Sequence, residues 1–500
     1  MIKLVENELI KIFKRKSIYW LFALAFVGMI VYNNINPDQN PPDTYIIDTK
    51  DFPIESVEEA LKNIDVNSEE FIIQMISIKR GKLWNEFEEG SWQRFALKDE
   101  NTTYGGGFSG YMNLNKDIDV YLKNIFDYEI NDNGSKEMYE ISKLKYNEYV
   151  EALKSNDWKN FVNVKIKNLE EMKRDKNIDN EKIEAINFEI ECYQLRLKNN
   201  IGYNYSNLTQ YLEQYKENYY FSQAYKNQQF NESQAFVNYE YNFYSSRAEL
   251  CKYALENNMN RDISNENNII YDNKIDARIF FIRTFQYFDI IIVIIAIYIS
   301  TTTVTEETSK RTMKNLLTKP HKRSKIIMSK IIACIITVII SMIFVVISQY
   351  LIGGSIFGFD SYVLDYIGYD FNNSEIITMS LFKYICIVGF LKFPIYIIII
   401  LFCIFMGVIN NNQAMTIILT LIIFLIGSVV LTEWSTVEKL SIITRYFITN
   451  NWDFSTYLFG QVSNISGITL YSSIINFFFH LALLLYLSIN QFNKKEIVNT

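Results

Sequence analysis

Six long apolar runs constrain the fold of this chain more than any other sequence feature. A helix needs roughly 20 apolar residues to cross the hydrocarbon core of a bilayer. Lipid offers no hydrogen-bond partner, so a spanning backbone must satisfy its own N–H and C=O groups, as a helix does. The runs are rich in Ile, Leu, Phe and Val, and they cover residues 17–34, 288–304, 326–352, 381–409, 414–431 and 468–489. The sequence therefore predicts an α-helical polytopic membrane protein with six transmembrane helices.

A long polar segment, residues 36–278, separates the first run from the second. It contains 43 Asp and Glu but 29 Lys and Arg, a net charge of −14, whereas the whole chain carries −7. Apolar residues recur every three or four positions within residues 158–172 and 183–197, which is the spacing of packed helices. No proline, which would interrupt a helix, occurs between Pro53 and Pro320. The segment is therefore expected to form a mainly helical domain.

Basic residues indicate which side of the membrane each loop occupies. Outside the polar segment the net charge is +7, and basic residues concentrate in residues 1–16, in residues 305–325 and in the tail after residue 489. Loops rich in Lys and Arg stay in the cytoplasm, and six spans place all three of these segments on one side. Both termini are therefore expected in the cytoplasm, and residues 36–278 and a polar loop at residues 353–380 are expected outside.

The two ends of the chain divide into further predicted parts. Residues 1–16 carry apolar residues at helical spacing and basic residues on other faces, as in an amphipathic helix on the inner membrane surface. Residues 17–35 are expected to remain as the first transmembrane helix, because no small-residue cleavage site follows them. Residues 279–500 then hold the five further transmembrane helices.

The sequence shows little that could form a catalytic, metal or nucleotide site. The Gly-rich stretch at residues 105–110 has no Gly-Lys-Ser/Thr ending, which a phosphate-binding loop requires. The two histidines, His321 and His480, lie far apart, which gives little support to a histidine metal site or a Ser-His pair. An acidic exterior also disfavours nucleic acid. We therefore expect no catalytic residue, no metal site and no cofactor in this chain, and no nucleic acid partner.

Two ionisable side chains fall inside the apolar runs. Lys392 lies in the fourth run beside Phe393 and Pro394, and His480 lies in the sixth. A charge in the membrane is costly and often functional, so both are candidate functional residues. The alternatives are structural: Lys392 marks the end of an interfacial helix, and His480 hydrogen-bonds to a neighbouring helix. Asp289, at the outer end of the second run, fits an interface position.

Two of the five cysteines lie in the polar segment. A disulfide between Cys192 and Cys251 is one interpretation if that segment is outside. No spacing rule supports the pair, and two buried thiols are the other interpretation. Cys334, Cys386 and Cys403 fall in apolar runs and fit as small hydrophobic groups.

The loop between the second and third runs carries a recognisable pattern. An acidic residue is followed by a threonine, a leucine pair, a proline, an arginine and a lysine: Glu307, Thr312, Leu316, Leu317, Pro320, Arg323 and Lys330. This order resembles the segment between the second and third helices of the type-2 ABC exporter permease family, although Arg311 replaces the usual glycine. The amphipathic start, the six spans and the tight turn at residues 410–413 are also similar. The resemblance covers roughly the first 35 and last 220 residues and leaves the polar segment as an insertion.

The resemblance implies that residues 305–325 contain a coupling helix that docks on a separate ATPase subunit. A short amphipathic element with a leucine pair can enter a groove on a partner, and its charges can set the register. The residues implied in this contact are Glu306, Glu307, Arg311, Thr312, Leu316, Leu317, Pro320 and Arg323. ATP and Mg would be bound by the partner ATPase. The alternative is an ordinary charged loop that only follows the distribution of basic residues.

By this resemblance the chain is the permease subunit of an ATP-driven ABC exporter in a lipid membrane, paired with a second permease chain as a homodimer or heterodimer. Its substrate would be amphiphilic, such as an antimicrobial peptide, a drug or a lipid, because an acidic outer domain attracts cations from a distance. The Ile-, Asn-, Lys- and Tyr-rich composition hints at an AT-rich bacterial genome, so the expected location is a bacterial cell membrane. Two other functions stay open: a membrane-anchored sensor or binding protein without transport, and an intramembrane enzyme that uses Lys392 or His480.

Overall fold

The structure of the chain is a computed structural model. It describes residues 1–35, 51–99, 117–174, 178, 180–204, 206–227, 234–261, 263, 276–309, 322–410, 412–436, 438–463, 465 and 467–494. In these residues, six helices are long and apolar enough to cross a membrane. They cover Lys16–Asn33, Asp289–Glu307, Arg323–Phe357, Leu381–Asn410, Gln413–Leu431 and Leu470–Lys494. The predicted class, an α-helical polytopic membrane protein with six transmembrane helices, is confirmed.

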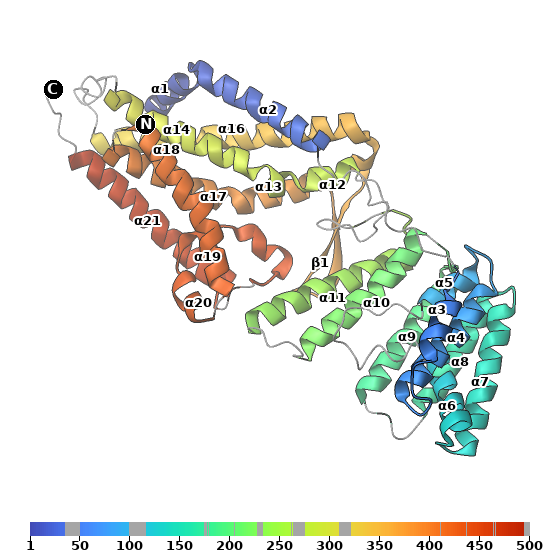
Figure 1. Cartoon of the computed structure of the whole chain (residues 1–500). Helices are drawn as coiled ribbons and strands as arrows, with labels where there is room; N and C mark the ends of the chain where they lie inside the picture. Colours follow the sequence, from blue (N-terminus) through green and yellow to red (C-terminus); the bar gives the residue numbers. More distant parts are fainter. Residues whose placement is uncertain are drawn as a thin grey trace.

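The spanning helices form a bundle, which Figure 1 shows at its upper left, with the start of α1 and the end of α21 at one end. We call this the terminal end, and we call the opposite end, which carries the polar segment, the domain end. Five spans are single helices: α2 (Lys16–Ile35), α14 (Asp289–Ser309), α16 (Arg323–Phe357), α17 (Leu381–Asn410) and α21 (Leu470–Lys494). The fifth span in chain order divides into α18 (Gln413–Leu421), a π-helical turn (Ile422–Ile426) and α19 (Gly427–Thr436).

Burial divides these spans into a core and a periphery. In the most apolar stretch of each helix, 67% of α14 and 56% of α17 is buried within the chain. The corresponding shares are 22% for α2 and 17% for α21. α14 packs against α16 and α17 around buried residues such as Ile292, Val338 and Ile399. The peripheral helices expose large apolar side chains, among them Trp20 and Phe479. Such faces suit contact with lipid, which is as apolar as they are.

The helix α17 continues through Lys392 without a break. It runs from Leu381 to Asn410 with Pro394 in its interior, where proline withholds one backbone donor. The helix therefore does not end at Lys392, and the position of the membrane boundary along it stays a prediction.

A short helix, α1 (Ile2–Phe13), precedes the first span and packs on α16 and α14. Val5, Glu8 and Ile12 are buried on one of its faces, at the three- and four-residue spacing of a helix. The structure thus has a helix within the predicted amphipathic segment, while its position on the cytoplasmic side stays a prediction. The glutamate on the buried face is not expected from an amphipathic pattern, and it leads to the candidate site below.

The polar segment is mainly helical where the structure describes it, as predicted. Its longer helices are α3 (Ile54–Leu61), α4 (Glu69–Asn85), α5 (Trp92–Asp99), α6 (Asp117–Asn131), α7 (Lys136–Lys154), α8 (Trp158–Lys173), α9 (Asn180–Lys198), α10 (Asn207–Lys226) and α11 (Gln234–Glu256). Side chains of Ser68, Ser135, Asp157 and Ser206 accept hydrogen bonds from N–H groups in the first turns of α4, α7, α8 and α10. Such short polar residues satisfy backbone donors at helix starts.

A second hydrophobic cluster fills this helical domain, separate from the core of the bundle. Tyr149, Phe161 and Tyr211 are among its buried side chains. Cys192 and Cys251 are also fully buried in it, each as a thiol. The disulfide between them is not formed in this structure, and their pairing stays a prediction.

Short elements join the domain to the bundle. The helices α12 (Ala277–Ile282) and α13 (Thr284–Tyr287) lead into α14. The 3-10 turn η3 (Asp360–Val363) follows α16. Between the fifth and sixth spans lie α20 (Glu438–Thr444) and the 3-10 turns η5 (Ile448–Asn450) and η6 (Phe454–Gly460).

A β-hairpin also connects the domain to the bundle. Its strands, β1 (Tyr366–Asp370) and β2 (Glu375–Met379), pair antiparallel between α16 and α17. Figure 1 shows β1 reaching from the bundle toward α11, and its Ile367 joins the hydrophobic cluster of the domain. At the turn, the Phe371 N–H donates to the Phe459 carbonyl at 2.8 Å. The sequence predicts only a polar loop here, so the hairpin is a finding of the structure.

We expect Tyr211→Phe to destabilise the helical domain. Its hydroxyl donates to the Arg261 carbonyl at 2.6 Å and accepts from the Ile263 N–H at 2.9 Å. Phenylalanine keeps the packing but leaves both backbone groups without this partner, at a cost of about 1–3 kcal/mol. Thermal unfolding of the purified protein measures the loss. The control is Tyr128→Phe, which keeps its stacking on Tyr139, and equal melting temperatures for the two variants would contradict the prediction.

Candidate functional site

Four charged side chains meet at the terminal end of the bundle. We call them the terminal cluster, and they are Glu8, Lys11, Glu307 and Lys330. The Lys330 ammonium lies 2.9 Å from the Glu8 carboxylate and 2.8 Å from that of Glu307. The Lys11 ammonium lies 2.7 Å from each of the same two carboxylates. Each positive group therefore contacts both negative groups, and the cluster has no net charge.

Three helices supply the terminal cluster. Glu8 and Lys11 are three residues apart on α1, which places them on one face. Glu307 lies near the end of α14, and Lys330 lies near the start of α16. The Lys330 side chain is completely buried, and that of Glu307 is 11% exposed. Because a buried charge without its partner is strongly unfavourable, the cluster fixes α1 against α14 and α16 in one arrangement.

Lys11 is the most exposed member of the cluster, with 43% of its side chain accessible. Burial disfavours its charge, but hydrogen bonds and Coulomb attraction from Glu307 and Glu8 outweigh this effect and raise the pKa of Lys11. Lys11 therefore stays protonated at neutral pH, and the balance of two positive and two negative groups is kept.

Further contacts hold both flanks of the predicted coupling segment. Arg15 forms an ion pair with Glu306 and donates to Thr302 Oγ1 at 2.7 Å, and both partners belong to α14. Arg323, at the start of α16, donates to the Asn493 carbonyl of α21 at 2.7 Å. The helices on either side of that segment are thus connected to α1 and to α21.

The residues implied in ATPase docking fall into two groups. Outside the described residues lie Arg311, Thr312, Leu316, Leu317 and Pro320. The described members, Glu306, Glu307 and Arg323, border that stretch on either side, and the docking role of all eight stays a prediction. What the structure adds is that Glu307 points into this chain, toward Lys11 and Lys330.

A second charged group lies at the domain end. Lys392 of α17 lies 3.1 Å from Asp289 at the start of α14 and 3.2 Å from Asp453, which precedes η6. We call these three residues the Lys392 triad. The other carboxylate oxygen of Asp453 accepts from the Ser455 N–H at 3.0 Å. Two carboxylates face one ammonium, so the triad carries one excess negative charge.

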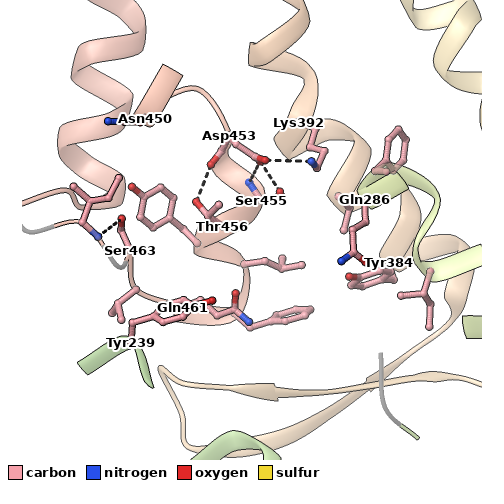
Figure 2. A pocket seen from close by; sticks show the side chains of 18 of the residues that line it. Tyr239, Gln286, Tyr384, Lys392, Asn450, Asp453, Ser455, Thr456, Gln461 and Ser463 are labelled. Atoms are coloured by element: carbon pink, nitrogen blue, oxygen red, sulfur yellow. Dashed lines mark hydrogen bonds and ion pairs between the residues drawn. The ribbon is translucent and has the colours of Figure 1, made fainter. Parts of the chain in front are cut away.

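A cavity of about 480 Å³ lies beside the Lys392 triad. Figure 2 shows Lys392 and Asp453 joined across its wall, with Gln286 and Tyr384 at the right of the view. The remaining lining residues come from α11, α12, α13, β1, α17 and residues 449–465. The cavity therefore lies where the helical domain, the hairpin and the bundle meet.

The sequence predicts Lys392 and His480 as candidate functional residues, and the two differ in their contacts in the structure. Lys392 is brought together with Asp289 and Asp453, whereas His480 Nδ1 lies 2.9 Å from the Asn476 carbonyl oxygen, one turn earlier on its own helix α21. Asp453 is not predicted, because an aspartate in a polar connection gives no distinguishing signal. Within the described part of the chain, no group of three His, Cys, Asp or Glu side chains could hold a metal ion.

We expect Lys330→Met to destabilise the bundle by about 3–5 kcal/mol, because it removes one cation from a buried group of charges. Adding Glu8→Gln removes the excess negative charge and leaves the pair between Lys11 and Glu307, so the double variant should recover part of the stability. Thermal unfolding in detergent measures both variants. Losses that simply add in the double variant would contradict the proposed coupling within the terminal cluster.

Comparison with known proteins identifies the family. A family model described as ABC-2 family transporter protein matches residues 136–496. The match includes five of the six spans, the Lys392 triad and the segment between α14 and α16. It also begins inside the polar segment, at α7, a region that the resemblance in sequence leaves unexplained. No curated protein and no solved structure matches the chain significantly. The chain belongs to the ABC-2 transporter family, and it is a membrane-spanning transport subunit of an ABC system.

Proposed function

We propose that this chain is the permease subunit of an ATP-driven exporter, which moves an amphiphilic substrate outward with energy from separate ATPase subunits. The terminal cluster carries this proposal. It joins α14 and α16, the helices on either side of residues 310–321, to α1 through ion pairs, of which the pair between Glu8 and Lys330 is buried. A loop that only followed the distribution of basic residues would have no need of such anchoring.

The first step of the proposed mechanism is docking on the ATPase. Leu316 and Leu317 supply an apolar pair in the segment between α14 and α16, and such a pair can enter a groove on a partner. The basic residues around the pair set the register of the contact. ATP and Mg bind to the ATPase, and closure of its subunits displaces the segment.

The second step carries this displacement through the bundle. α14 is the most buried span, and it packs against both α16 and α17. Its terminal end holds Glu307, and its domain end holds Asp289 in contact with Lys392. A rigid-body shift of α14 therefore acts on the terminal cluster and on the Lys392 triad together. Rigid-body movement of packed helices is a common way to switch between two states.

Charge and surface support the proposed arrangement in the membrane. The basic terminal end faces the cytoplasm of a bacterial cell, and the acidic domain of residues 36–278 lies outside. The exposed apolar side chains of α18, α19 and α21, such as Ile418, Trp434 and Phe478, provide a surface for lipid and for a second permease chain. Two permease chains and two ATPase subunits would then form the working transporter.

The acidic outer domain supports the proposed substrate class. A net charge of −14 on residues 36–278 raises the local concentration of cationic molecules near the membrane surface. Antimicrobial peptides and cationic drugs combine such a charge with an apolar body. We therefore propose export of amphiphilic cations.

Affinity capture of the tagged protein in mild detergent tests the proposed function. We expect the wild type to retain an ATPase subunit in stoichiometric amount and Leu316→Asp/Leu317→Asp to lose it, because a carboxylate is costly to bury in an apolar groove. Leu144→Asp is the matched control. Leu144 is 68% exposed on α7 of the helical domain, so the same substitution there should leave the capture unchanged.

Each contrary outcome has a distinct meaning. Wild-type protein without any ATPase would contradict the exporter and favour a sensor or binding protein with an extracellular receptor domain. Full retention of the ATPase by the double variant would show that docking does not depend on the leucine pair.

A further inference from the structure

The cavity beside the Lys392 triad has the composition of a small-molecule site. Its volume of about 480 Å³ lies within the usual range of roughly 300–1,000 Å³ for such sites. Among the lining residues, two carry a charge, Lys392 and Asp453. Six others are aromatic, namely Tyr239, Phe285, Tyr366, Tyr384, Tyr457 and Phe459. Aromatic and apolar walls with a few placed polar groups are typical of sites that bind organic molecules.

Two carboxylates and one ammonium lie at this cavity, and the excess negative charge favours a cationic ligand. Lys392 contacts Asp289 and Asp453, and each carboxylate shares the same ammonium. Arg283 and Arg445 belong to adjoining segments, but neither lines the cavity. If a ligand brought one positive charge to Asp453, Lys392 could pair with Asp289 alone. The result would be two neutral pairs, the ligand with Asp453 and Lys392 with Asp289. Neutral pairing is favoured where charges are partly withdrawn from water.

The aromatic walls distinguish an organic cation from an inorganic one. The rings of Tyr366 and Tyr384 stack with their centroids 3.8 Å apart, and the Phe459 ring lies 6.0 Å from that of Tyr366. Aromatic faces attract cations through the quadrupole of the ring, and they offer flat apolar area to the body of a ligand. An inorganic ion would use the carboxylate but leave most of the cavity unfilled.

A buried tyrosine lies close to Lys392 along α17. Tyr396 lies one turn beyond Lys392 on α17 and is completely buried. Its hydroxyl has no hydrogen-bond partner among the described residues. A buried hydroxyl without a partner is unfavourable. Tyr396 therefore leaves an unsatisfied polar group one turn from Lys392 on the same helix.

We propose that this cavity binds a single-charged organic cation with an apolar body. The cationic group of the ligand pairs with Asp453, and its body lies against the rings of Tyr366, Tyr384 and Phe459. Lys392 then pairs with Asp289 alone. Because Asp289 begins α14, occupation of the cavity acts on the helix that also carries Glu307 of the terminal cluster.

The role of the bound cation as an exported substrate rests on the proposed exporter function. Its binding does not, because the site is built from this chain alone. The experiment therefore uses the purified full-length protein in detergent without any ATPase or ATP.

Equilibrium binding of radiolabelled tetraphenylphosphonium tests the site. Tetraphenylborate has the same shape and the opposite charge, and its binding is measured in a separate sample because the two ions pair with each other when mixed. We expect saturable binding of the cation and no saturable binding of the borate. Asp453→Asn should weaken this binding about tenfold or more, which corresponds to the loss of one charged contact. Asp360→Asn, an exposed aspartate of η3 that does not line the cavity, should leave the affinity unchanged.

Two results would overturn the proposed site. The first is the absence of saturable binding to the wild type, and the second is equal affinity in Asp453→Asn and the wild type. Tyr384→Leu adds a variant without a charge change, and it should also weaken binding through the lost aromatic face. If the protein captures an ATPase but does not bind the cation, the proposed exporter function is kept and the proposed site is wrong. If it binds the cation but captures no ATPase, the proposed site is kept and the exporter function is wrong.

Discussion

The arrangement of the terminal end depends on four charges that alternate in sign, three of them buried and the fourth, Lys11, partly exposed. Glu8 and Lys11 from α1, Glu307 from α14 and Lys330 from α16 contact one another at 2.7–2.9 Å. Ions are expensive to remove from water, and only close pairing with opposite charges compensates the loss. The cluster therefore allows few alternative positions for these three helices. This constraint turns an ordinary amphipathic helix into a fixed part of the bundle.

At the domain end, charges also pair with opposite charges, but the numbers of positive and negative groups differ. The terminal cluster has two positive and two negative groups, whereas Lys392 faces both Asp289 and Asp453. A balanced buried cluster suits a structural role, because it needs nothing further. An unbalanced group beside a cavity suits a binding role, because a ligand can complete it. Since α14 contributes a residue to both groups, the two ends of the bundle are connected by one rigid helix.

The bundle and the helical domain could be predicted from sequence because their signals are local. Apolar runs of sufficient length allow little except spanning helices, and three- and four-residue spacing identifies the packed helices of the domain. The hairpin β1–β2 was not predicted, because its strands are only five residues long each and lie in a polar connection. Its pairing with the domain depends on contacts with α11, which are distant in sequence.

The charged sites were only half predictable for the same reason. Glu307 is implied by the family resemblance, and Lys392 attracts notice because a charge in an apolar run is costly. Their partners Glu8 and Asp453 lie hundreds or tens of residues away in polar surroundings, where aspartate and glutamate are common. Nothing in a single sequence tells such a residue from a solvated one. Burial and distance, which only the folded chain supplies, identify them.

Coupling through α14 requires that movement at the terminal end reaches the cavity at the domain end. Labelling of Gln461→Cys with a membrane-impermeant maleimide tests it most directly, because Gln461 is exposed and lines the cavity. The exposed Cys386 is first replaced by serine, and the complex with its ATPase is compared without nucleotide and trapped with ATP. We expect a several-fold change in labelling rate at residue 461 and none for Leu144→Cys in the helical domain. Equal rates at residue 461 in the two states would contradict it.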